Sequence, residues 1–188
     1  ATLAAQPLLA GYLFEQDYAV PPTITLTVAP GVTVQGAGHK ALLVQGRLNA
    51  LGTVTQPITF TSFTDSGPGQ WGGIGFDGGS GHLRHATVRY AGHRNDLTDG
   101  LFNSHYRAAV AAQDATLHMQ DVILRDTASD GYDHGLLIDD SDVTVTDTTF
   151  RSIGDGDAND VAMRVIGAST TLEMSGCTFG GNTRDRKS

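Results

Sequence analysis

An eight-residue pattern of apolar and polar positions occurs four times along the chain. Its first, third, sixth and eighth positions are mostly apolar, and two middle positions interrupt the alternation. The four copies are LRHATVRY (83–90), LHMQDVIL (117–124), VTVTDTTF (143–150) and LEMSGCTF (172–179). Alternating apolar residues indicate a strand with one buried face, whereas the shift of phase requires the chain to turn between two short strands. The pattern therefore predicts two short strands joined by a corner, four times over.

The fifth position of the pattern supports a sharp corner in three copies. It is Asp121, Asp147 or Gly176, and Asp and Gly tolerate the left-handed backbone that a tight corner uses. The remaining copy has Thr87 there, which fits such a corner poorly. The same alignment places His85 at an inward position, so we expect it to be buried and hydrogen-bonded or to end its strand early.

A third strand precedes each pair. Apolar residues two positions apart mark it at 74–76, 110–112, 136–138 and 163–165. Self-similarity with a period of about 20 to 50 residues is typical of stacked repeats. Three strands, a corner and a variable loop per repeat describe a triangular coil whose strands pair in parallel with those of the next repeat. The N-terminal half reads similarly at 24–34, 41–52 and 57–62.

Composition favours an all-β fold. The 188 residues include 24 Gly but only 12 Lys and Arg, and of the 20 acidic residues only Glu15 and Glu173 are Glu. The residues that fill helix surfaces are thus scarce, while strand and turn formers abound. The net charge of −8, without a basic cluster, argues against a nucleic-acid partner. No apolar run approaches the ~18 residues that membrane insertion needs.

Several stretches resemble right-handed parallel β-helix repeat proteins of bacterial secreted and cell-surface type, the pectate-lyase-like superfold. They are TLTVAPGVTVQ (25–35), ALLVQGRLNALGTVTQPITFTS (41–62), QWGGIGFDGGSGHLRHATVRYAG (70–92) and, at a coil end, CTFGGNT (177–183). The resemblance covers nearly the whole chain. It implies a single-domain β-helix of about six to seven coils, complete or part of a longer one. It implies no particular activity, because the fold carries lyases, glycosidases, adhesin stalks and binding modules.

The domain organisation follows from this reading. Residues 1–22 form an N-terminal capping segment, 23–183 the β-helix, and 184–188 a tail or truncation point. The segment LLAGYLFEQDYAVPP (8–22) is apolar and ends in two prolines, which cannot extend a strand ladder. The sequence offers no comparable cover for the last coil. We therefore expect further coils, self-association or a partner chain there, because unpaired strand edges invite pairing.

The candidate ligand-binding residues lie in long loops. The loops 92–107, 126–135 and 152–161 would lie side by side on stacked coils, gathering Asp, His and Tyr. Tyrosines, with Trp71, would stack on sugar rings, while the polar residues would bond hydroxyl groups. The predicted ligand-binding residues are Tyr106, Tyr132, His105, Asp133 and Arg107. A solvated loop face with Asp chosen for turns explains the same residues.

Catalysis would require a pair of carboxylates, or a carboxylate-bound cation beside a basic residue. On the outer side of the strands at 74–165, only Asp139 and Arg164 qualify, and they lie one coil apart. Asp130 and His134, in SDGYDHGLLIDD (129–140), complete the candidates. The other outward positions of these strands are inert, which makes this wall resemble a packing surface.

DGDAND (155–160) is the sharpest motif for a metal. Asp155, Asp157 and Asn159 occupy the first, third and fifth positions of an EF-type loop, whose oxygen atoms suit calcium. Position six is Asp160 and position twelve is Ile166, where an EF-hand has Gly and Glu, so an intact EF-hand is excluded. Either a simpler calcium site or a plain Asp-rich turn fits.

Two functions remain open from the sequence. The preferred one is a non-enzymatic extracellular or cell-surface module, acting as a stalk, as an adhesin segment, or as a binder of polysaccharide or a surface protein. The alternative is a polysaccharide lyase or glycoside hydrolase that uses loops 92–107 and 126–140. Calcium is the only cofactor that the sequence suggests.

Overall fold

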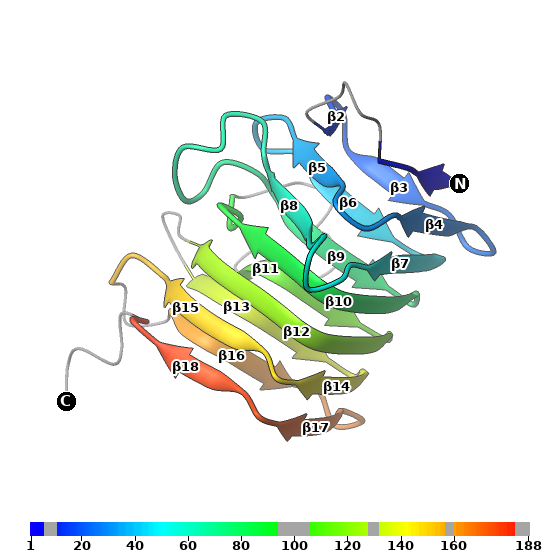
Figure 1. Cartoon of the computed structure of the whole chain (residues 1–188). Helices are drawn as coiled ribbons and strands as arrows, with labels where there is room; N and C mark the ends of the chain where they lie inside the picture. Colours follow the sequence, from blue (N-terminus) through cyan, green and yellow to red (C-terminus); the bar gives the residue numbers. More distant parts are fainter. Residues whose placement is uncertain (6–10, 94–105, 128–131, 157–159, 183–188) are drawn as a thin grey trace.

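The computed structural model shows an all-β chain (Figure 1). It describes residues 1–5, 11–93, 106–127, 132–156 and 160–182. Within these residues there is no helix, and hence none that is long and apolar enough to cross a membrane. Every strand pairing is parallel. The predicted all-β class and the parallel pairing between successive repeats are therefore confirmed.

Seven strands form the longest path of pairings, on one side of the molecule. They are β1 (Thr2–Leu3), β4 (Thr25–Val28), β7 (Arg47–Leu51), β10 (Ser80–Arg89), β12 (Thr116–Thr127), β14 (Asp142–Thr146) and β17 (Thr171–Ser175). A second side contains the C-terminal halves of β10 and β12, which follow the corner in each strand. The other strands of this side are β2 (Tyr12–Phe14), β5 (Thr33–Gly36), β8 (Ile58–Ser62), β15 (Thr149–Ile153) and β18 (Thr178–Gly180).

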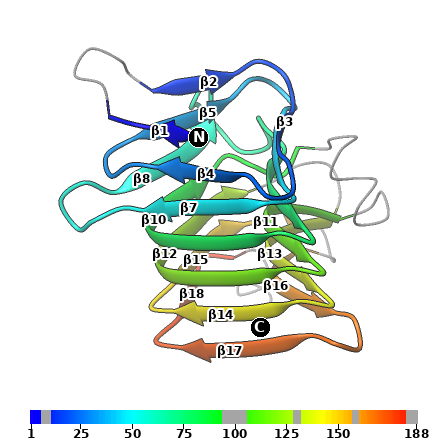
Figure 2. The same ribbon diagram turned by 90° about the vertical axis from the view of Figure 1, so that its right-hand side faces the viewer.

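The third side is a separate six-stranded sheet. Its strands are β3 (Tyr18–Val20), β6 (Ala41–Val44), β9 (Gly73–Asp77), β11 (Tyr106–Gln113), β13 (Tyr132–Asp139) and β16 (Val161–Ile166). Successive strands along the chain lie on the three sides in turn. Each strand pairs with the strand that precedes it on the same side (Figure 2). This arrangement is compatible with a parallel β-helix.

The corner predicted from the phase shift is present, but the first copy of the pattern is aligned differently. Asp121, Asp147 and Gly176 have φ of 52°, 49° and 65°, as a left-handed corner requires. The strand register pairs Leu83 with Met119, not with Leu117. The corner residue of β10 is therefore His85, with φ of 43°.

This register corrects two expectations. Thr87 is not a corner residue, which explains why it fitted that position poorly. His85 is not an inward strand residue; its Nδ1 lies 3.7 Å from Asp121 Oδ2, and its side chain is partly exposed. The sequence alignment went wrong because Gly81, which pairs with Leu117, occupies an inward position without an apolar side chain.

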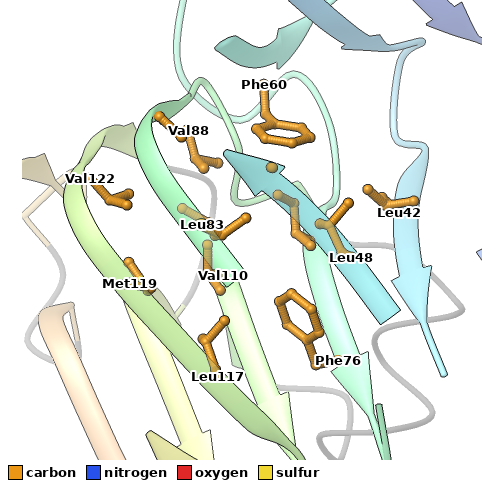
Figure 3. Packing of buried hydrophobic residues seen from close by; sticks show 14 of the residues in the cluster. Leu42, Leu48, Phe60, Phe76, Leu83, Val88, Val110, Leu117, Met119 and Val122 are labelled. Atoms are coloured by element: carbon orange, nitrogen blue, oxygen red, sulfur yellow. The ribbon is translucent and has the colours of Figure 1, made fainter. Parts of the chain in front are cut away.

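Stacked apolar side chains fill the interior. Leu117, Met119, Val122 and Leu124 are all buried, so both short strands of β12 face inward on either side of the corner. Figure 3 shows how side chains from successive strands meet there. A strand with one such face gains its stability by stacking on its neighbours, because a single winding could not bury it.

Residues 2–20 add one more level of parallel strands. β1, β2 and β3 pair with β4, β5 and β6. The role of residues 1–22 as a cap stays a prediction, as do the boundaries at 22 and 183. At the other end, Val165 and Phe179 are 44% and 46% exposed. Contact of β16, β17 and β18 with a partner or with further coils also stays a prediction.

Candidate functional site: an outer groove on the longest sheet path

Polar side chains cover the outer side of the path from β4 to β17. Because side chains alternate along a strand, buried Leu48, Leu117 and Val143 leave their neighbours facing outward. Register stacks these neighbours from strand to strand, about 4.8 Å apart. One such ladder consists of Thr25, Arg47, Ser80, Thr116, Asp142 and Thr171. A second consists of Thr27, Asn49, His82, His118, Thr144 and Glu173.

Three hollows follow the first ladder. They have volumes of about 430, 260 and 210 Å³. Arg47, Ser80 and Thr116 line the first two, and Thr116 also lines the third. Because neighbouring hollows share lining residues, they lie next to one another across several strands. We call this row of hollows the outer groove and define it by Thr25, Arg47, Ser80, Thr116 and Asp142.

The groove changes charge along its length. Arg47 Nε donates a hydrogen bond to Ser80 Oγ at 3.3 Å. This bond holds the guanidinium beside the hollow of about 260 Å³, which we call the middle hollow. The smallest hollow is lined by Asp114, Asp140 and Asp142. The groove thus offers hydroxyl groups with a cation towards β7 and carboxylates towards β14. Such a surface matches a hydroxyl-rich ligand better than an apolar one.

A separate hollow of about 420 Å³ lies at the N-terminal end. Core residues such as Leu26, Val34 and Phe60 line it, together with Tyr12 and Phe14. Its lining is mostly apolar, so it lacks the hydroxyl and charged groups of the outer groove.

Three of the four predicted catalytic residues lie in the six-stranded sheet, namely His134, Asp139 and Arg164. Arg164 pairs in register with Leu137, while Asp139 pairs with Ile166, so the two candidates are offset by two residues along adjacent strands. Burial, then Asp140 and Asp114, raise the pKa of the Asp139 carboxyl. His134 is fully buried. Asp130 lies outside the described residues.

His134 is held in its neutral form. Burial and the positive charge of Arg164 lower the pKa of this histidine to about 4. Its strand neighbours in register are Ala108 and Val161. A histidine without solvent access in this structure cannot exchange protons with a substrate on the surface.

The predicted ligand-binding residues are only partly gathered. Tyr106 pairs in register with Tyr132, and Arg107 with Asp133, so the start of β11 lies beside the start of β13. Asp133 is fully buried, which is incompatible with direct contact to a surface ligand. The side chains of Tyr106 and Tyr132 and all of His105 lie outside the described parts of the chain.

Trp71 does not stack on a sugar. Its side chain is fully buried, and its indole Nε1 donates to the carbonyl oxygen of Arg89 at 2.8 Å. Phe14 packs against it edge-on, with ring centroids 6.2 Å apart. Trp71 is therefore a core residue, which corrects its assignment to a ligand surface.

Asp160 is the centre of the hydrogen bonds in the turn that contains the predicted metal motif. Carboxylate oxygens of Asp133, Asp155 and Asp160 lie within 4.8 Å of one another. Asp160 is buried, and Oδ2 accepts hydrogen bonds from the backbone N–H groups of Asp155 and Gly156, each at 3.0 Å. Its Oδ1 accepts from the N–H group of Asp133 at 3.1 Å. Asp160 thus holds the turn closed, while Asp157 and Asn159 lie outside the described residues.

Sequence reasoning missed the outer groove. The candidates came from the long loops and from the outward side of the strands at 74–165, whereas Arg47, Ser80 and Thr116 lie in β7, β10 and β12. The available signal was the outward position of each alternating segment, such as RLNAL (47–51) and TLHMQ (116–120). Using that signal requires the register, which the first copy of the pattern had shifted by two residues.

Comparisons with known proteins add no assignment. No family model matches the chain, and no match is found among curated proteins or solved structures. Fold type and function therefore depend on the residues and the geometry described above.

Proposed function

We propose that this chain is a right-handed parallel β-helix of the secreted and cell-surface type, and that it acts as a non-enzymatic binding or stalk module outside the cell. The observation that carries the binding role is the outer groove, a row of neighbouring polar hollows that crosses successive strands. An extended polysaccharide lying along it would meet a polar side chain at each strand step of about 4.8 Å.

The proposed ligand surface is hydrated and polar. Thr25, Ser80 and Thr116 offer hydroxyl groups, and Arg47 offers charged donors. Such groups replace water at sugar hydroxyls, and bridging waters complete the contact. Specific surface proteins are the other proposed partners, and a protein ligand would use the same groove.

Glycan binding is tested by blocking the groove. Thr116→Tyr places a large side chain where all three hollows meet, and Arg47→Ala removes the cation. Each change should weaken binding on an array of neutral and acidic polysaccharides by about tenfold or more. Thr149→Tyr, a partly exposed position on β15 outside the groove, is the matched control.

The binding role fails if the unaltered chain retains no glycan and no surface protein. It also fails if Thr116→Tyr and Thr149→Tyr bind equally well, because then the ligand lies elsewhere.

A polysaccharide lyase or glycoside hydrolase is the second candidate. The pKa of Asp139 is shifted upward, which is the direction that a general acid requires. Incubation with polysaccharides should then yield new reducing ends or unsaturated products, and Asp139→Asn should abolish them. Product formation with this dependence would replace the non-enzymatic role, whereas its absence removes Asp139 from the site.

Calcium binding is proposed for the turn closed by Asp160. Three clustered carboxylates supply the oxygen atoms that a hard cation prefers. Millimolar calcium should raise the melting temperature of the chain, and Asp155→Asn should remove the increase. Asp147→Asn is the control, because Asp147 is an exposed corner residue and Asn also tolerates its φ of 49°. An unchanged melting temperature would exclude the site.

A further inference from the structure

Two histidines lie side by side on the outward surface of the β10–β12 pair. His82 on β10 and His118 on β12 are register partners. The two strands lie side by side in Figure 2. Their ring centroids are 6.1 Å apart, and the ring planes meet at 64°. His118 is exposed and His82 half-buried, so water and small solutes reach the pair.

This spacing suits two imidazoles that share one metal ion. Imidazole nitrogen binds Zn²⁺ at about 2.0 to 2.1 Å, with similar lengths for related ions. Each ring centroid then lies roughly 3 Å from the ion, so two rings on one ion have centroids roughly 5 to 6 Å apart. The observed separation of 6.1 Å is just above this interval. Small rotations about the side-chain bonds of the exposed His118 bring both nitrogens onto one ion.

The surroundings provide room and further donors. The pair lines the middle hollow of about 260 Å³, which holds an ion with several waters at about 30 Å³ each. Asn49 occupies the next position of the same ladder, beside His82. Its amide oxygen, or a bound water, completes a coordination sphere that two histidines alone leave open.

The protonation state favours a metal, whereas the nearby charge opposes it. Burial, then His118 and Arg84, lower the pKa of His82, a shift in the direction of the neutral form that metals bind. Arg47 lines the same hollow and repels a cation. That repulsion is screened at an exposed site, whereas the imidazole bonds are direct. Only ions with high affinity for imidazole overcome it, and among divalent ions Cu²⁺ ranks highest.

We propose that His82 and His118 form a surface site for a divalent transition-metal ion that prefers imidazole, with Cu²⁺ bound most tightly and Ni²⁺ and Zn²⁺ less so. The site is distinct from the carboxylate cluster around Asp160, which would take a hard cation. The pair lies in the middle hollow of the outer groove, but the proposal does not depend on polysaccharide binding, because the test contains no glycan.

The experiment is a calorimetric titration of the chain with CuCl₂, NiCl₂ and ZnCl₂. All proteins carry Cys177→Ser, so that the single thiol neither binds nor reduces copper. One equivalent of Cu²⁺ should bind at micromolar or lower concentration. His82→Asn and His118→Asn should each weaken this binding at least tenfold, and the order of affinity should be Cu²⁺, Ni²⁺, Zn²⁺.

Two matched histidine changes serve as controls. His85→Asn removes an imidazole from the neighbouring corner, and His39→Asn disrupts the stack of His39 on His93, whose centroids lie 3.4 Å apart. Both should leave Cu²⁺ binding unchanged. Electron paramagnetic resonance of the Cu²⁺ complex should show coupling to two nitrogens, reduced to one in His118→Asn.

The proposal is overturned if His82→Asn and His118→Asn bind Cu²⁺ like the parent, or if His39→Asn is the variant that loses it. Absence of any binding at micromolar Cu²⁺ overturns it as well. Circular dichroism of each variant separates loss of the ligand from loss of the fold.

Discussion

The outward surfaces of the two sheets carry opposite chemistry on similar backbones. On the path from β7 to β14, the outward residues Thr116, His118 and Gln120 are exposed. On the six-stranded sheet, the equivalent positions Ala111 and Leu137 are 5% and 0% exposed. Both sets of strands pair in parallel and share one interior.

The difference is already visible in the local sequences. TLHMQ (116–120) alternates, as expected for a strand with one face in water, whereas ALLV (41–44) and AAVAA (108–112) are apolar throughout. Ala108, Ala111 and Leu137 form a small cluster of their own, against which Ile166 packs. One side of the molecule is thus suited to contact with polar ligands, and the other to packing.

The largest effect is expected when a charge is placed on each of the two surfaces. Leu137→Asp puts a carboxylate at a fully buried position and should lower the free energy of unfolding by more than about 3 kcal/mol. Thr144→Asp, at an outward position of β14, should change it by less than about 0.5 kcal/mol. Urea denaturation followed by circular dichroism measures both. Equal losses would show that the two surfaces do not differ as described.

A test of intermediate size uses the buried histidine of the six-stranded sheet. His134 has its pKa lowered from 6.5 to about 4, so the unfolded chain takes up a proton that the folded chain excludes. Its contribution to stability is therefore complete above pH 6.5 and falls as the pH drops towards 4. Each pH unit between the two pKa values costs up to about 1.36 kcal/mol, so the free energy of unfolding should fall by about 3 kcal/mol over this interval.

His134→Gln separates this contribution from those of the other histidines. The variant should be less dependent on pH between 6.5 and 4 than the parent, as measured by urea midpoints at each pH. Parallel curves for the two proteins would mean that His134 titrates normally in the folded chain.

The smallest test concerns the corner that ends the polar surface. Asp121 has φ of 52°, where a residue with a Cβ is strained unless its side chain is Asn or Asp. Asp121→Ala should lower stability by about 1 kcal/mol, and Asp121→Gly should restore part of the loss. Thermal denaturation measures the order of the three proteins. If the Ala variant melts at the same temperature as the parent, the left-handed backbone at this corner carries no strain.

The alternation of the repeats predicted much of the fold. The all-β class and parallel pairing followed from segments such as Val143–Val145, because a short strand must bury one side and its period is two. The corner at Asp147 followed from the change of phase. The copy at 83–90 was misaligned, since an inward Gly81 gives no apolar signal and His85 stands where Asp121 does in the next winding.

The sequence by itself determined which side of each strand is apolar, since that depends only on neighbouring residues. Only the tertiary structure decided which side chains from different windings meet. Arg47, Ser80 and Thr116 are far apart along the chain and share a hollow because the register stacks them. Burial of Asp133, His134 and Trp71 was likewise decided there, because a local pattern cannot show what packs against a polar or aromatic residue.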